Sequence, residues 1–206
     1  MTHYTGSPEL LFVRNVHTNR RPGKVGFEHA PPSADGMRES KEVAAYLKTI
    51  MGERGVMLFT SPLTSRSMMT AHSVMAELDE EYLSIPPEAH QLYIGPDERA
   101  RIDASMDPES VAIAELKAMR SLWHDLEAFH RHLDDPLSVV IMSGLAILRY
   151  FAGQGTYSRE DVDRIIPTGA VIHINARTLT GPALKGHKVD PLTKYLATRN
   201  IKHADA

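Results

Sequence analysis

Polar residues follow three apolar runs of the sequence, at the points where the runs end. They are, in chain order, Arg14 and Asn15, the segment from Thr60 to Arg66, and Ser143 and Gly144. Ligands of open parallel sheets bind outside the carboxyl ends of the strands. Guanidinium groups bind oxyanions through forked, permanently charged hydrogen bonds, and amides and hydroxyls donate further ones. If the three runs are neighbouring strands, these residue types predict an anion site.

The elements that would position these residues follow from the apolar pattern. We predict strands over 9–14, 56–60, 137–142 and 170–175, and a short strand near 91–94. Helical spacing of apolar residues predicts helices over 37–51, 65–78, 108–133 and 144–153, whereas most of 83–106 looks irregular. Strands that alternate with helices indicate an α/β fold, a three-layer α/β/α sandwich with a mostly parallel sheet. We expect a single domain over residues 1–184 and a polar tail over 185–206, which carries a short helix or frays.

Composition and charge exclude several classes of protein. The 206 residues, 42% hydrophobic and 24% charged, are ordinary for a globular domain. A net charge of -3 gives no electrostatic case for nucleic acid or an anionic membrane. The first residues lack the pattern of a signal peptide, and no apolar run approaches the roughly 18 residues of a membrane span. We therefore expect a cytoplasmic protein with neither nucleic acid nor a membrane as partner.

Metal and thiol chemistry also find little support. The sequence has no cysteine, which excludes a disulfide scaffold, a thiol nucleophile and a thiolate metal site. His124 and His130 lie about 240° apart on a helix, and His132 does not join them on one face. Glu127 and His130 form one Glu-x-x-His pair, but a di-metal bundle needs two. We expect neither a metal ion nor a cofactor.

The segments around the strand ends resemble the histidine phosphatase superfamily, the phosphoglycerate-mutase-like group. The matching segments are FVRNV (12–16), APPSADGMRESKEVAAYL (30–47), LFTSPLTSRSMMTA (58–71), VVIMSGLAILRYFAG (139–153) and IPTGAVIHI (166–174). Together they span roughly residues 9–176. The resemblance implies a histidine-phosphatase-like fold. It also implies that Arg14 and Arg66 are the arginines of the phosphate pocket, with one residue inserted before Arg66.

The sequence departs from the family at the residues that carry the family's reaction. In the resemblance, the attacking histidine of the Arg-His-Gly motif falls on Asn15, and the glycine of that motif falls on Val16. The second histidine falls on Ser143. A phosphohistidine mechanism needs an imidazole nitrogen aimed at phosphorus, and the nitrogen of Asn15 can donate hydrogen bonds but cannot attack. The family's general acid has no aligned counterpart, and Glu88 is the nearest candidate.

The sequence therefore predicts a pseudo-phosphatase, not an active phosphatase of the usual mechanism. Such a domain would bind a small anionic or phosphorylated ligand, or a protein partner, without phosphohistidine chemistry. The candidate ligand-binding residues are Arg14, Asn15, His17, Arg66, Ser143 and Gly144, and none is assigned a catalytic role. A homodimer is implied by the resemblance alone, because members of the family often self-associate.

Other functions stay open at this point. An enzyme with rerouted chemistry could use His17 or Ser143 at the same pocket, on a phosphate ester or another small acidic substrate. A serine nucleophile needs a general base, and none lies next to Ser143 in the sequence. Alternatively, Arg14 could pair with a local acid, His17 could be an ordinary hydrogen-bonded loop histidine, and Asn15 and Ser143 could only fill the pocket. A structural subunit with a vestigial pocket is the third hypothesis.

Overall fold

The computed structural model of the chain describes residues 10–19, 31–52, 56–78, 88–105, 107–129, 137–153, 155–174 and 184–203. Its strands are β1 (Leu10–Arg14), β2 (Val56–Thr60), β3 (Glu88–Gln91), β4 (Leu137–Met142), β5 (Val171–Ile174) and β6 (Gly186–His187). Its helices are α1 (Ala34–Met51), α2 (Ser65–Glu77), α3 (Pro96–Ser105), α4 (Pro108–Phe129), α5 (Gly144–Ala152), α6 (Arg159–Ile165) and α7 (Asp190–His203).

The six strands form one mixed sheet in the order β3-β2-β4-β1-β5-β6. β1 pairs in parallel with β4, with Leu10 opposite Ser138 and Arg14 opposite Met142. β2 pairs in parallel with β4 and with β3, whereas β5 runs antiparallel to β1 and β6. The carboxyl ends of β1, β2 and β4 therefore meet at one edge of the sheet.

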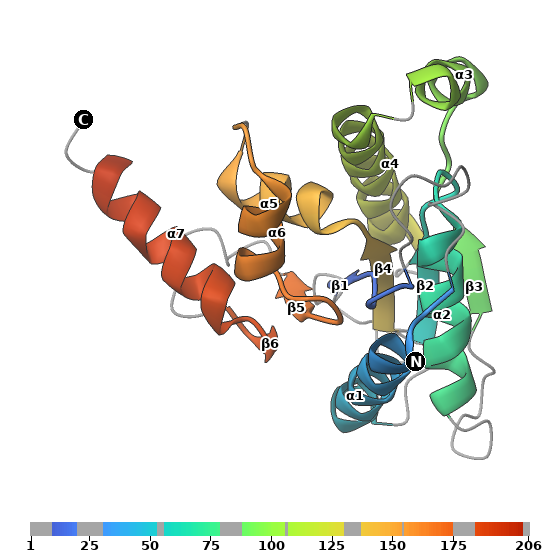
Figure 1. Ribbon diagram of the computed structural model, residues 1–206. Helices are drawn as coiled ribbons and strands as arrows, with labels where there is room; N and C mark the ends of the chain where they lie inside the picture. The colour runs from blue at the N-terminus through green and yellow to red at the C-terminus, as the bar shows by residue number, and fades with distance from the viewer. Residues whose placement is uncertain are drawn as a thin grey trace.

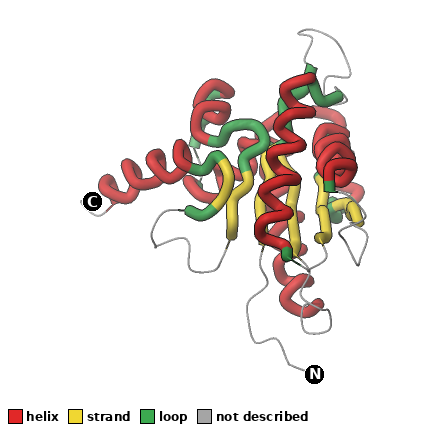
Figure 2. Tube along the Cα trace, turned by 90° about the horizontal axis from the view of Figure 1, so that it is seen from below, coloured by secondary structure: helices red, strands yellow, loops and turns green. Residues whose placement is uncertain are grey.

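Helices cover both faces of this sheet (Figures 1 and 2). Side chains alternate between the two faces along a strand. Leu11 and Val13 of β1 belong to an apolar cluster with residues of α1 and α2. Leu10 and Phe12 belong to a second cluster, which includes residues of α4, α5 and α6. This arrangement confirms the predicted three-layer α/β sandwich with a mostly parallel sheet.

Before the tail, β3, α3 and α6 differ from the sequence prediction, and α6 was not predicted. β3 begins at Glu88, three residues before the predicted strand, and α3 lies in a segment predicted to be irregular. In α3, Ile102 is a buried apolar residue of a helix that is otherwise mostly polar, so the sequence shows no helical apolar stripe. Pro96 at the first position and the acidic residues of the first turn were the available start signals.

The segment predicted as a polar tail contains β6 and α7. β6 pairs with β5, and Val189 and Leu192 are buried in the cluster of α4, α5 and α6. Near the end of α7, Nη1 of Arg199 donates a hydrogen bond to the carbonyl oxygen of Ala152 at 3.0 Å. Residues 186–199 therefore pack on the domain.

The described part of the chain contains no helix long and apolar enough to cross a membrane. Within the same residues, no group of three His, Cys, Asp or Glu side chains is placed to hold a metal ion. The structure does not describe the side chains that the sequence analysis considered as metal ligands, namely those of His124, Glu127, His130 and His132.

Candidate anion site at the carboxyl ends of the strands

A pocket of about 690 Å³ lies at the sheet edge where β1 and β4 end. The six residues predicted to bind a ligand all line it: Arg14, Asn15, His17, Arg66, Ser143 and Gly144. Its remaining wall includes Tyr157, Arg159 and Asp163, from α6 and the loop before it. Three arginines and one aspartate among the lining residues give the pocket an excess of positive charge. Its size and charge suit an organic anion.

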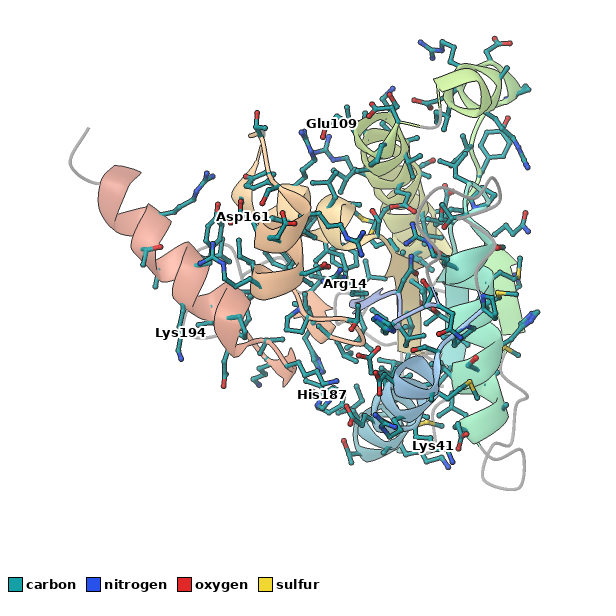
Figure 3. The ribbon with its side chains drawn as sticks, in the orientation of Figure 1. Arg14, Lys41, Glu109, Asp161, His187 and Lys194 are labelled. Carbon is teal, nitrogen blue, oxygen red and sulfur yellow. The ribbon has the colours of Figure 1, made fainter. Side chains whose placement is uncertain are left out.

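Arg14 is held against α6, near the centre of the molecule (Figure 3). Its Nη1 donates to the carbonyl oxygens of Ile166 and Val162, and its Nη2 forms a salt bridge with Asp163. Burial lowers the pKa of Arg14, and the carboxylate of Asp163 acts in the opposite direction. Arg14 thus forms a salt bridge with an acid, which is the alternative that the sequence left open. The side chain of Arg14 also lines the pocket.

Gly144 makes room for this position of Arg14. A Cβ atom at residue 144 would lie 2.6 Å from Nε of Arg14 and 2.8 Å from a methyl carbon of Val162. Both distances are shorter than van der Waals contact, so any side chain here would displace the side chains of Arg14 and Val162. The glycine is therefore needed for close packing of α5 against Arg14, in addition to its place in the pocket wall.

Asn15 is buried in the wall of the pocket and is fixed by two hydrogen bonds. Its Oδ1 accepts from the hydroxyl of Ser67 at 3.1 Å, and its backbone N–H donates to the carbonyl oxygen of Met142 at 3.1 Å. With Oδ1 occupied by Ser67, the amide nitrogen is the group of Asn15 left to donate toward a ligand.

His17 is bound to the start of α1. Its Nδ1 lies 2.7 Å from the hydroxyl of Ser33, which caps α1 by accepting from the backbone N–H of Gly36 at 3.1 Å. The backbone N–H of His17 donates to Oε2 of Glu39 at 2.7 Å. These are the contacts of a hydrogen-bonded loop histidine, the alternative that the sequence left open, on a residue that also lines the pocket.

Ser143 caps α5 and is hydrogen-bonded to a buried acid. Its hydroxyl accepts from the backbone N–H of Ala146 at 3.2 Å and donates to Oε2 of Glu115 at 2.6 Å. The backbone N–H of Ser143 donates to the same oxygen at 3.1 Å. Glu115, on α4, has an exposed fraction of 0%. An acid absent from the neighbouring sequence is thus supplied from 28 residues earlier in the chain.

The environment of Glu115 acts on its pKa in both directions. Burial raises the pKa, while hydrogen bonds from Ser143 and Ser61 and the positive charge of Arg66 lower it, with a net upward shift. Arg66 is the second residue of α2 and is half-buried in the pocket wall. Arg66 therefore faces both the pocket and the acid behind Ser143.

Sequence reasoning missed Glu115, Asp163 and Tyr157. Glu115 gave a usable signal, because it lies four residues after Val111 and four before Met119, on the buried face of its helix. Asp163 and Tyr157 gave none, since both belong to a polar stretch that looks solvent-exposed. The hydroxyl of Tyr157 donates to the carbonyl oxygen of Gly153 at 3.3 Å.

The structure does not bring Glu88 to the pocket. Glu88 is the first residue of β3, and it pairs with Met57 near the start of β2. The two strands are parallel, so Glu88 lies at the amino end of the sheet, whereas the pocket lies at the carboxyl end. This backbone position gives no support to its interpretation as the nearest candidate for a general acid, which stays a prediction.

The raised pKa of Glu115 predicts a pH dependence of stability. Because the folded state binds this proton more tightly than the unfolded chain, the free energy of unfolding should fall as pH rises from about 4.3 through the raised pKa. In Glu115→Gln this component should vanish, flattening the curve by up to about 1.4 kcal/mol per pH unit. Urea unfolding of both proteins between pH 4 and 8 measures the difference. Parallel curves would contradict the prediction.

Comparison with known proteins gives a likeness to solved structures alone. No protein-family model matches the chain, and no curated protein matches it. The phosphoserine phosphatase of Entamoeba histolytica in complex with 3-phosphoglyceric acid is 14% identical, with a TM-score of 0.49, over 90% of this chain and 99% of that one. The protein histidine phosphatase SixA complexed with tungstate is 16% identical, with a TM-score of 0.49, over the same shares. A mycobacterial glucosyl-3-phosphoglycerate phosphatase is 12% identical, with a TM-score of 0.47, over 82% and 90%.

Proposed function

We propose that this domain is a pseudo-phosphatase. It binds a phosphorylated or other small organic anion without the phosphohistidine chemistry of the usual mechanism. The observation that carries the proposal is the pocket itself. It brings Arg66, the amide of Asn15 and the start of α5 to one cavity with an excess of positive charge. At the end of β1, where the resemblance places an attacking imidazole, stands an amide held by Ser67.

Two kinds of donor support anion binding at this place. Arg66 carries a permanent charge and can bind an oxyanion through two N–H groups. Gly144 and Leu145, the first residues of α5, line the pocket. Their backbone N–H groups have no acceptor within the helix, because the first amides of a helix lack one. Such helix starts favour negatively charged groups.

The experiment is a binding titration, followed by a test for a covalent phosphoryl group on the protein. Calorimetry with inorganic phosphate and with phenyl phosphate should show saturable binding at one site per chain. After incubation with a labelled phosphate ester, no acid-labile, base-stable phosphoryl group should be found on the protein, because that stability is typical of phosphohistidine. Absence of binding by both anions would contradict the binding half of the proposal. Phosphorylation of any histidine would contradict the second half of the proposal, the absence of phosphohistidine chemistry.

A further inference from the structure

The acid behind Ser143 has no role in anion binding, because Glu115 is fully buried and reaches the pocket through Ser143. We infer that Ser143 and Glu115 are a nucleophile and its general base, placed to take a phosphoryl group from a bound phosphomonoester. The inference rests on the proposed anion site for substrate binding and adds a covalent step to it.

The geometry meets the requirement for base-assisted attack. A general base must lie within about 2.6–3.2 Å of the atom whose proton it removes, and Oε2 of Glu115 lies 2.6 Å from Oγ of Ser143. The hydroxyl uses its proton toward Glu115 and one lone pair toward the N–H of Ala146. Its second lone pair is left for the pocket that Ser143 lines.

The surroundings of the pair suit the charges of the step. Burial raises the pKa of Glu115 above its ordinary value, and this makes the carboxylate a stronger base. The positive charge of Arg66 on α2 acts on Glu115 and lowers its pKa. The same charge offsets the repulsion between this carboxylate and an incoming phosphate. The first amides of α5 are placed to receive the phosphoryl oxygens as charge shifts onto them.

In the step itself, Oγ of Ser143 attacks phosphorus, the Oγ–P bond forms and the bond from phosphorus to the leaving oxygen breaks. The hydroxyl proton passes to Oε2 of Glu115. The leaving group departs with the electron pair of the broken bond, so an aryl ester is the suitable substrate, since a phenolate leaves without needing a proton. Glu115 has no surface in the pocket from which to activate a water, so we expect the phosphoserine to persist.

The test is a rapid-mixing experiment with p-nitrophenyl phosphate on the full chain. We expect a burst of about one p-nitrophenolate per chain, then slow turnover, and an acid-stable phosphoryl group on Ser143 by mass spectrometry. Glu115→Gln keeps the size of the side chain and should slow the burst about 100-fold or more. The same substitution should not weaken binding of inorganic phosphate, because it removes a negative charge near the site. The wild-type burst should speed up with rising pH as Glu115 ionises, and the Gln variant should lose this dependence.

The controls separate this inference from the proposed function. Ser73→Ala, a serine of α2 whose hydroxyl donates to the sulfur of Met37, should leave the burst unchanged, and Ser143→Ala should abolish it. The site of the adduct is read on the wild-type chain, so the test does not depend on whether a variant folds. Phosphate binding without a burst, or a burst unaffected in Glu115→Gln, would overturn the inference alone and assign these contacts to capping of α5. No phosphate binding at all would remove the proposed function, and this inference with it.

Discussion

Replacing Arg14 with alanine should lower the free energy of unfolding by about 2 kcal/mol. The side chain is 7% exposed and donates to the carbonyl oxygens of Val162 and Ile166. Its removal leaves the buried carbonyl oxygen of Ile166 without this donor, whereas the carbonyl oxygen of Val162 still accepts the backbone N–H of Ile166. An unsatisfied buried acceptor costs about 1–3 kcal/mol. The ion pair itself contributes less, because the side chain of Asp163 is 46% exposed and screened by water.

Urea unfolding of the wild type and Arg14→Ala measures this loss. Arg164→Ala is the matched control, because Arg164 is also an arginine bound to an aspartate, Asp161, but its side chain is 74% exposed. Exposed pairs of this kind contribute about 0–1 kcal/mol. If the two variants proved equally stable, Arg14 would not hold α6 in place. The expected instability also means that loss of binding in Arg14→Ala would not by itself locate a ligand.

Arg66→Ala should weaken binding of inorganic phosphate about 30-fold, which corresponds to about 2 kcal/mol. This is within the range of hydrogen bonds to a charged group. Loss of Arg66 leaves the contacts between α6 and the sheet intact, because Arg14 supplies them. Calorimetric titration gives the affinity directly. Arg66→Lys should retain part of it, because lysine keeps the charge and loses the planar fork.

Arg164→Ala serves again as the control. The substitution removes the same charge from the domain, and Arg164 is not among the residues that line the pocket. Its affinity for phosphate should stay within about twofold of the wild type. An equal loss in both variants would indicate a general effect of net charge and not a contact made by Arg66. Unchanged affinity in Arg66→Ala would place the anion elsewhere in the pocket.

The sequence predicts the strands better than the contacts of the site. β2 and β4 are found at the predicted residues, because both are short apolar runs with abrupt polar ends. The parallel pairing of β2 with β4 and of β4 with β1 gathers the predicted residues at one edge, as expected from the general rule for such sheets. The direction of the Arg14 guanidinium could not be predicted, since it depends on α6, almost 150 residues away.

For Glu115, too, the sequence predicts the position of the residue but not its contact. Its place on the buried face of α4 follows from helical periodicity, but its partner does not. Ser143 meets it because α4 and α5 lie side by side over one face of the sheet (Figure 1). Periodicity tells which face of a helix is buried, whereas the tertiary arrangement decides which residue of another element meets that face.

The position of β1 has a consequence for how the chain folds during its synthesis. β1 lies between β4 and β5, and Leu10 pairs with Ser138 and Ile174. At translation rates of roughly 5–20 residues per second, its first partner leaves the ribosome about 6–26 s later. Until then four apolar residues that end fully buried have no strand to pair with. Pairings of such long sequence separation form slowly, so we expect the nascent chain to rely on chaperones for its central strand.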